Sequence, residues 1–190
     1  NECDCLFLPD QSILNNIKQI KSSYKSQHLY GLNRHRHFDG VVTIVNRLFD
    51  LVKPTRAIFG KKDYQQLLLI SDFVKENNLP INIIGSEIVR DQSGLALSSR
   101  NNHLSADEKK LASNLYKTLK KIANKVDTLT INDIINEKNK LRNLGFSIDY
   151  LNVCNPLELS EESNYNIRPL IVAIAAYIGE IRLIDNILIT

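Results

Sequence analysis

Methionine and tryptophan are absent from this sequence of 190 residues, and cysteine, proline and glycine are scarce, with 3, 5 and 7 residues respectively. No apolar run approaches the ~20 residues that a membrane-spanning helix needs, and the first residues do not resemble a signal peptide. The cysteines show neither CxxC spacing nor nearby ligand pairs, which disfavours a disulfide framework and a zinc site. We therefore expect a cytoplasmic protein with no membrane segment, no protein-held metal, and reduced, half-buried cysteines.

Neither sign of charge is in large excess. Lysine and arginine number 24 against 21 aspartates and glutamates, which gives a net charge of +3. The one dense basic cluster, residues 34–37, lacks the interleaved aromatic side chains of a single-strand nucleic-acid binder. A hydrophobic fraction of 43% is ordinary for a globular chain that forms one domain or two small ones. We expect small molecules, not nucleic acid, as partners.

Short apolar segments alternate with helical patterns over residues 1–88. The pattern predicts strands at 4–8, 56–59 and 81–84, and helices at 13–20, 41–52 and 63–77, with Asp10 and Asp39 as caps of the first two helices. Such alternation is typical of right-handed crossovers in a doubly wound parallel α/β sheet. Ligands of these folds bind beyond the carboxyl ends of the strands, where residues 60–63 would lie.

The pattern changes over residues 89–190. A short strand at 88–90 and a turn at 91–94 precede two helices, one with a capping box of Ser105 and Glu108 and one that begins at Thr130 and stops at Gly145. Strands follow at 146–153, 170–178 and 181–189, the last two as a hairpin. This order predicts a second, smaller α+β domain.

The stretch GKKDYQQL, residues 60–67, concentrates polar side chains at the turn from a strand to a helix. Gly60 would permit a tight bend, and we expect Asp63 and Gln66 to form a capping box. Lys61 and Lys62, however, place positive charge at the positive end of the helix dipole, an arrangement that an anionic ligand would make favourable. From these residues alone, an ordinary solvated turn is somewhat favoured over a phosphate or carboxylate site.

A second polar stretch, LALSSRN, covers residues 95–101. Its hydroxyls and guanidinium could form a mobile phosphate clamp, because both groups donate hydrogen bonds to phosphate oxygens. It could equally be a surface linker, and alone neither stretch is specific.

Together the two stretches resemble the pantothenate synthetase family. The similarity also includes HFDGVVTIVNRLFDLVKP and LIVAIAAYIGEIRLIDNI, in the same order, and it is weakest at residues 11–33. The resemblance implies a Rossmann-like, nucleotidylyltransferase-like fold and a homodimeric ligase that uses ATP and Mg²⁺. Such an enzyme joins pantoate to β-alanine through a pantoyl adenylate, and it releases pyrophosphate and then AMP.

The resemblance also implies roles for individual residues. It assigns Gln66 to pantoate and leaves the roles of Arg34 and His37 open, with a loop-anchoring role for His37 slightly ahead. Lys62, Ser98 and Arg100 would be catalytic, through electrostatic stabilisation and positioning. The residues that it places against ATP are Gly60, Lys61, Lys62, Asp63, Val89, Leu97, Ser98, Ser99 and Arg100.

Two family motifs, a histidine-containing nucleotide motif and an asparagine-proline-x-glutamine-phenylalanine segment, are expected upstream of Asn1. We therefore expect that residues 1–190 alone are inactive and expose a sheet edge. Lys61 stands where an acidic residue is common and His35 where proline is common. Two alternatives stay open: another nucleotidylyltransferase-superfamily enzyme, or an inactive nucleotide-binding homologue.

Overall fold

The computed structural model describes residues 3–15, 17–32 and 36–190, and it forms two compact units. The first unit comprises Asn1–Ala57 and Leu69–Ile83, and the second comprises Ile58–Leu68 and Ile84–Thr190. The domain boundary expected between residues 88 and 89 stays a prediction. In the part of the chain that the structure describes, no helix is both long enough and apolar enough to cross a membrane.

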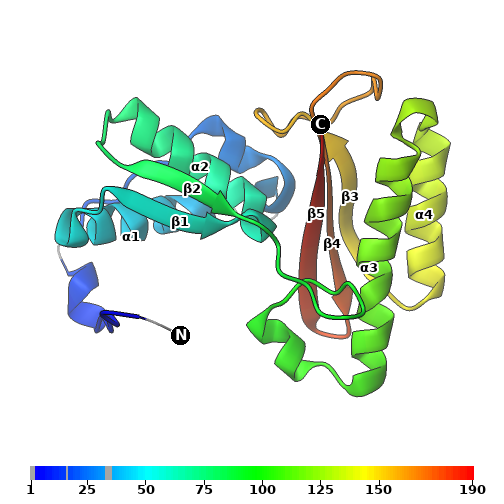
Figure 1. The fold of residues 1–190 in the computed structure, drawn as a ribbon, viewed down its shortest axis with the longest axis horizontal. Coiled ribbons are helices and arrows are strands. Elements are labelled where there is room, and N and C mark those ends of the chain that lie inside the picture. The colour runs from blue at the N-terminus through cyan, green and yellow to red at the C-terminus, as the bar shows by residue number, and fades with distance from the viewer. Residues whose placement is uncertain (1–2, 16, 33–35) are drawn as a thin grey trace. The chain divides into compact units, whose positions relative to one another are not determined.

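A strand-helix-strand crossover provides the parallel sheet that the sequence predicts (Figure 1). Strand β1 (Arg56–Gly60) leads through helix α2 (Tyr64–Glu76) to strand β2 (Asn82–Ser86), which pairs with β1. Helix α1 (His37–Val52) ends before Pro54, as expected for a proline that cannot continue a helix. The apolar face of α2 is buried at Leu69, Ile70, Phe73 and Val74.

The first twenty residues depart from their predicted structure. Residues 4–8 form no strand, because no described strand pairs with them, and Leu6 and Leu8 are 74% and 80% exposed. Asp10 does cap a helix, by accepting a 2.8 Å hydrogen bond from the Ser12 N–H. That helix is only the 3₁₀ turn η1 (Gln11–Leu14), and the helix expected through Ile20 is absent from the described residues. Short helices draw their stability from packing, and Leu14 remains exposed.

Helix α1 differs from its prediction at its start and on its surface. Arg36, not Asp39, is the N-cap residue. The Asp39 carboxylate instead accepts hydrogen bonds from the Ser22 N–H and hydroxyl, at 2.8 and 2.7 Å. Val42 and Phe49 are buried as expected, whereas Ile44 and Val52 are exposed, so the buried stripe is narrower than the apolar pattern suggested.

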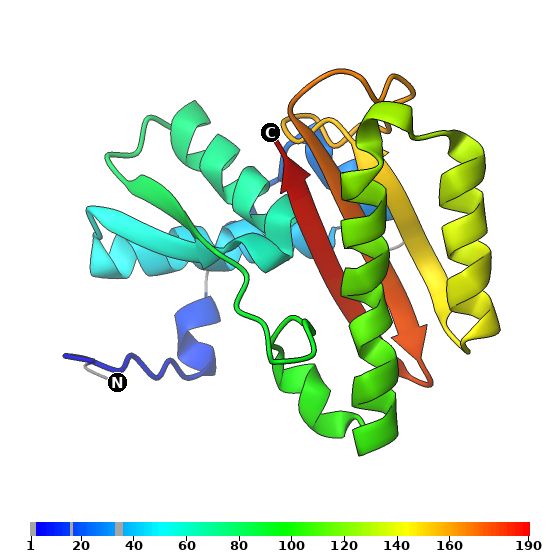
Figure 2. The same cartoon turned by 45° about the vertical axis from the view of Figure 1, so that its right-hand side comes forward.

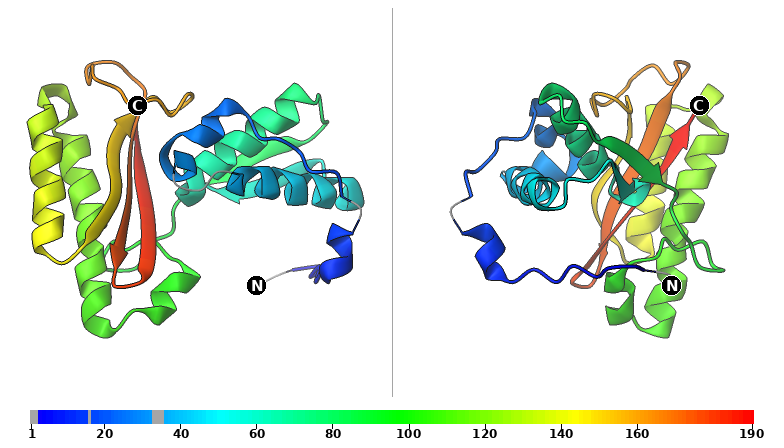
Figure 3. Two further views of the ribbon diagram at one scale, coloured as in Figure 1. Left: turned by 180° about the vertical axis from the view of Figure 1, so that it is seen from behind. Right: turned by 60° about the vertical axis from the view of Figure 1, so that its left-hand side comes forward.

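The second unit is a three-stranded antiparallel sheet with two helices on one face (Figures 1 and 2). Strands β3 (Ser147–Cys154), β4 (Leu170–Ile178) and β5 (Ile181–Ile189) lie in the order β3-β4-β5. Helices α3 (Ala106–Asn124) and α4 (Ile131–Asn143) cover the sheet, as the view from behind also shows (Figure 3).

The remaining short 3₁₀ turns of the two units are η2 (Tyr24–Gln27), η3 (Leu29–Leu32), η4 (Lys61–Asp63), η5 (Ser99–His103) and η6 (Val126–Thr128).

Both helices of this unit begin where the sequence indicates. Ser105 with Glu108 and Thr130 with Asp133 form complete capping boxes, and Gly145 follows α4 with a φ of +96°. The core between helices and sheet is built from large aliphatic side chains, namely Leu115, Leu119, Ile122, Leu141, Leu151, Val172 and Ile174. This apolar layer supplies the main driving force for folding the unit.

Two smaller expectations fail. Residues 88–90 form no strand, since only an isolated bridge joins Arg90 to Ala96. Cys3 and Cys5 are exposed, whereas Cys154 is buried, and burial raises the pKa of its thiol to about 12. The expectation of half-buried cysteines is therefore wrong for all three.

Candidate functional site

The corner at residues 60–66 forms without two features that the sequence suggested. Gly60 has a φ of −72° and open space around it, so an ordinary residue could adopt its conformation. Asp63 lies inside the 3₁₀ turn η4, which precedes α2. The capping box expected between Asp63 and Gln66 is therefore absent from the described hydrogen bonds. The bend comes from the 3₁₀ turn itself.

The two lysines of the corner have different surroundings. Lys61 forms an ion pair with Glu87. The Lys62 side chain forms no ion pair or hydrogen bond with any residue that the structure describes. Its pKa is lowered, chiefly by burial, while nearby Asp63 and Asp185 oppose the shift and Arg100 adds to it. Lys62 is thus a partly desolvated cation with no fixed counter-ion.

Lys62 and Ser98 line the same small cavity of about 10 Å³, roughly enough for one water molecule. Asn101 also lines it and is 9% exposed. The Asn101 amide donates to the Ala96 carbonyl at 3.0 Å, but its Oδ1 is buried without a hydrogen-bond partner. The structure therefore brings the Lys62 ammonium and the Ser98 hydroxyl, one group from each sequence stretch, to the same small cavity.

The segment 97–100 is exposed except at the half-buried Ser98, and it is held mainly by backbone contacts. The Leu97 N–H donates to the Val89 carbonyl at 2.9 Å, which places these two expected ATP-contacting residues side by side. Ser98 caps the turn η5 by accepting a 3.3 Å hydrogen bond from the Arg100 N–H. Ser99 and Arg100 are exposed.

The remaining predicted residues differ in their exposure. Gln65 is buried at 8% exposure, whereas Gln66, the expected pantoate ligand, is only half-buried. His37 is exposed and packs edge-to-face on Tyr30 and Phe38, with ring centroids 4.9 and 5.2 Å away. Arg34 and His35 lie outside the described residues.

Sequence reasoning missed a buried polar cluster beside the corner. Asp185 and Asn186 on β5 are 5% and 6% exposed. The Arg90 guanidinium forms two hydrogen bonds with the Asp185 carboxylate, of 2.6 and 2.9 Å, and stacks 3.7 Å from the centre of the Tyr116 ring. Burial raises the pKa of Asp185, and Arg90 opposes that shift. The sequence signal was a charged and an amide residue inside the apolar strand RLIDNILI.

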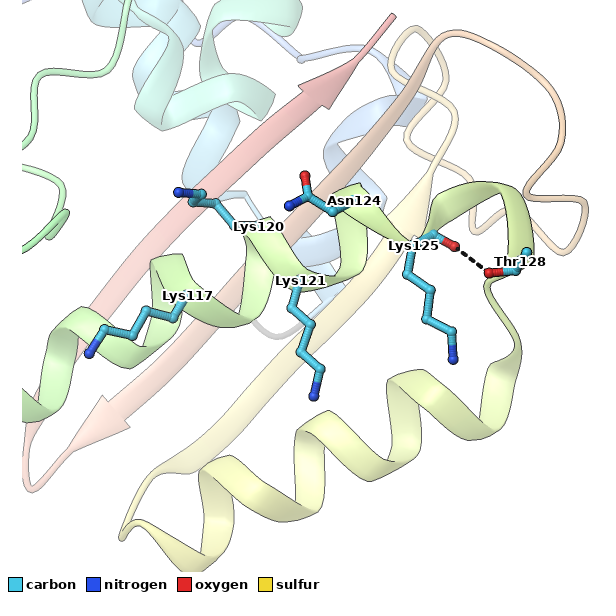
Figure 4. Close-up of a pocket in the computed structure, with 6 residues that line it drawn as sticks. All are labelled: Lys117, Lys120, Lys121, Asn124, Lys125 and Thr128. Atoms are coloured by element: carbon cyan, nitrogen blue, oxygen red, sulfur yellow. Dashed lines mark hydrogen bonds between the residues drawn. The ribbon is translucent and has the colours of Figure 1, made fainter.

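A groove of about 510 Å³ along α3 carries another group of cations (Figure 4). Lys121 and Lys125 reach toward α4, where they pair with Glu137 and Asp133 at 2.6 Å each. These two lysines already have carboxylate partners, so they connect the helices. The other residues that line the groove are Lys117, Lys120, Asn124 and Thr128.

Solved structures share this architecture, which defines the class of protein. A pantothenate synthetase from Thermus thermophilus superposes with a TM-score of 0.82 at 36% identity, over 90% of this chain and 62% of its own. A pantoate-beta-alanine ligase from Francisella tularensis, complexed with beta-gamma ATP and beta-alanine, gives 0.71 at 31% identity, over 91% of this chain and 59% of its own. The chain thus has the Rossmann-like, nucleotidylyltransferase-like α/β fold with a smaller antiparallel domain.

The family follows from the sequence comparison. The pantoate-beta-alanine ligase family matches residues 1–188. Pantothenate synthetases of Ectopseudomonas mendocina and Shewanella amazonensis are 39% and 42% identical, over 98% and 97% of this chain and 68% of each relative. The chain belongs to the pantoate-beta-alanine ligase family.

Proposed function

We propose that the protein joins pantoate to β-alanine at the expense of ATP, through an enzyme-bound pantoyl adenylate. The observation that carries this proposal is Lys62, a partly buried cation without a fixed counter-ion that lines a small cavity together with Ser98. Family membership supports the reaction class, and the Francisella relative was solved with a nucleotide and β-alanine. The substrates, the cytoplasmic location and a homodimer are parts of the same proposal.

The first step, formation of the adenylate, requires positive and hydrogen-bonding groups around the phosphates of ATP. A pantoate carboxylate oxygen attacks the α-phosphorus of ATP, and the bond to the bridging oxygen breaks to release pyrophosphate. Negative charge on the phosphate oxygens is stabilised by groups fixed beforehand in a poorly solvated site. Lys62, Ser98 and Arg100 would supply an ammonium, a hydroxyl and a guanidinium, respectively. None of them needs to transfer a proton in this step.

The second step forms the amide. The neutral amine of β-alanine attacks the acyl carbon of the adenylate, AMP leaves with the electron pair of the broken acyl–oxygen bond, and the nitrogen loses a proton. Gln66 would hold pantoate by hydrogen bonding. The further residues proposed to contact ATP are Gly60, Lys61, Asp63, Val89, Leu97 and Ser99.

Magnesium fits this site as part of the nucleotide substrate. Among the described residues, no group of three or more histidine, cysteine, aspartate or glutamate side chains could hold a metal ion. Mg²⁺ often binds mainly through substrate phosphates and water. We therefore assign no residue of this chain to the metal.

An assay of partial reactions tests the proposal, with any residues beyond 1–190 in place. Pantoate and ATP should release pyrophosphate, and further addition of β-alanine should give equal amounts of pantothenate and AMP. A dinucleotide product would indicate another nucleotidylyltransferase. Binding of ATP without pyrophosphate release would indicate an inactive homologue.

A further inference from the structure

Asp185 and Asn186 are buried next to each other in the middle of strand β5, whose other residues are all aliphatic except Arg182. Burying a charge and an amide is unfavourable unless both are hydrogen-bonded. The adenylation chemistry proposed above uses neither side chain. Their partners explain why they lie here.

Asn186 holds the backbone of the corner. Its Nδ2 donates to the carbonyl oxygens of Lys61 and Lys62, each at 3.0 Å. An amide NH₂ has two hydrogens, so this geometry uses both of them on successive peptide groups. In a trans peptide the N–H points opposite to the C=O. Fixing the Lys61 carbonyl toward Asn186 therefore turns the Lys62 N–H away from it.

The Asp185 carboxylate is engaged by other groups. It receives the two hydrogen bonds from Arg90, and the Asn186 backbone N–H donates to its Oδ1 at 2.8 Å. Asp185 attracts Lys62 electrostatically, yet the two form no ion pair. The Lys62 ammonium therefore remains available to a ligand.

Arg90 is in turn held in place. Its guanidinium donates to the Gly94 carbonyl at 3.1 Å and stacks on Tyr116. Gly94 has a φ of +90°, and a Cβ there would lie 2.6 Å from Tyr116 Cδ1, so this turn requires glycine. The chain of contacts runs from Tyr116 and Gly94 through Arg90 and Asp185 to the neighbouring Asn186.

We propose that Asn186 is a positioning residue for Lys62: its two hydrogen bonds fix the peptide groups on both sides of the Lys62 Cα, and thereby aim the ammonium at the phosphates of a nucleotide. This inference rests on the proposed function. Asn186 does not touch the substrate; it acts through Lys62.

The test replaces the donor by an acceptor of nearly the same shape. Asn186→Asp removes both donated hydrogen bonds and places a carboxylate beside two carbonyls. We expect kcat for pyrophosphate release to fall by about 100-fold, the size of effect that a misplacement of about 1 Å can cause. The KM values for ATP and pantoate should change much less. Asn114→Asp is the matched control, since Asn114 donates to one carbonyl on α3, and its kcat should stay close to wild type.

A double-mutant cycle separates positioning from general stability. If Asn186 acts through Lys62, Asn186→Asp should have little further effect on kcat in a Lys62→Ala background. Additive losses would overturn the proposal, as would a folded Asn186→Asp enzyme with near-normal kcat. Urea unfolding reports whether each variant is folded, and Asn186→Ala replaces Asn186→Asp if the latter is not. If neither variant folds, the role is structural and the proposal is wrong.

The wild-type assay distinguishes failure of this inference from failure of the proposed function. If the wild-type protein does not release pyrophosphate from ATP and pantoate, the proposed function is wrong. If it does and the Asn186 variants are equally active, only the positioning role is wrong.

Discussion

The corner at Gly60–Asp63 and the segment at Leu97–Arg100 carry the same kinds of phosphate-binding groups but are held in different ways. The corner is tied to β5 by two hydrogen bonds from one buried amide, and its Lys62 is partly desolvated. The segment is exposed except at the half-buried Ser98, with Leu97 52% accessible, and Arg100 forms no ion pair within the described residues. One region is prepared before a ligand arrives, and the other is free to respond to it.

This difference suggests a division of labour. Electrostatic catalysis works best with charges that need no reorganisation during the reaction. Segments that close over substrates, in contrast, have few contacts in the open state. We therefore expect Lys62 to dominate the chemical step and Ser98–Arg100 to become ordered around the nucleotide.

The largest effect should come from Lys62→Ala. This change removes a prepositioned charge, so pyrophosphate release should fall by about 100-fold or more, the usual cost of losing one such donor. Thermal unfolding should change little, because Lys62 has no ion pair to lose. Lys117→Ala, which removes a cation from α3, is the control and should leave the rate unchanged. Near-normal release in a folded Lys62→Ala variant would contradict the assignment.

Removal of the Arg100 charge should have the next largest effect. Arg100→Ala should lower adenylate formation by about 10- to 100-fold, less than Lys62→Ala, because this exposed charge must first be brought into place. Arg100→Lys should recover only part of the loss, since an ammonium lacks the planar fork that binds two phosphate oxygens. Single-turnover measurements of pantoyl adenylate test this order. If Arg100→Ala lowers adenylate formation more than Lys62→Ala does, the exposed segment, and not the corner, contributes most to the chemical step.

The pH dependence provides a test of Lys62 that does not remove it. Burial lowers its pKa, so the ammonium should lose its proton, and adenylation its rate, at a pH below that expected for an ordinary lysine. Stability should respond to pH in the opposite direction to the rate. The unfolded chain binds more protons between the two pKa values, so the free energy of unfolding should rise with pH in that range.

Lys62→Arg provides the matched variant for this pH test. Arginine keeps its charge, so the alkaline fall in pyrophosphate release should disappear, even if the variant is slower. Identical alkaline limbs for the two proteins would show that another group is responsible.

Hydrogen exchange should detect the response of the exposed segment. Amides of residues 95–101 should become several-fold better protected when ATP and Mg²⁺ are added, as expected for a segment that orders on binding. Amides of α2, which start in a regular helix, should change less. Equal protection with and without nucleotide would mean that the segment is already fixed or does not bind.

How well the sequence predicts the structure depends on whether the interacting residues are close together in the chain. Local signals were reliable where both partners are close in the chain, as in the capping boxes at Ser105 and Thr130. The same reasoning failed at residues 4–8 and 13–20, because apolar spacing does not reveal whether a packing partner exists. It also missed Asn186, whose partners at the corner are 124 and 125 residues away. The candidate site residues came from motif resemblance, whereas the network behind them needed the fold.

The smallest effect on pyrophosphate release should come from Lys61→Ala, although Lys61 is adjacent to Lys62, where the largest effect is expected. Lys61 already pairs with Glu87, whose side chain is 82% exposed. Such surface pairs contribute about 0–1 kcal/mol, so this substitution should barely alter stability. Because Glu87 offsets the charge of Lys61, the rate of pyrophosphate release should fall by no more than about fivefold, which corresponds to about 1 kcal/mol. The loss should appear mainly in the KM for ATP.

Glu87→Gln is the companion variant: it frees the Lys61 ammonium and should leave the KM for ATP unchanged or lower it. If Lys61→Ala is as damaging as Lys62→Ala, the two lysines act as a unit, and the hydrogen bonds that Asn186 makes to both backbone carbonyls would then position a pair of charges instead of one.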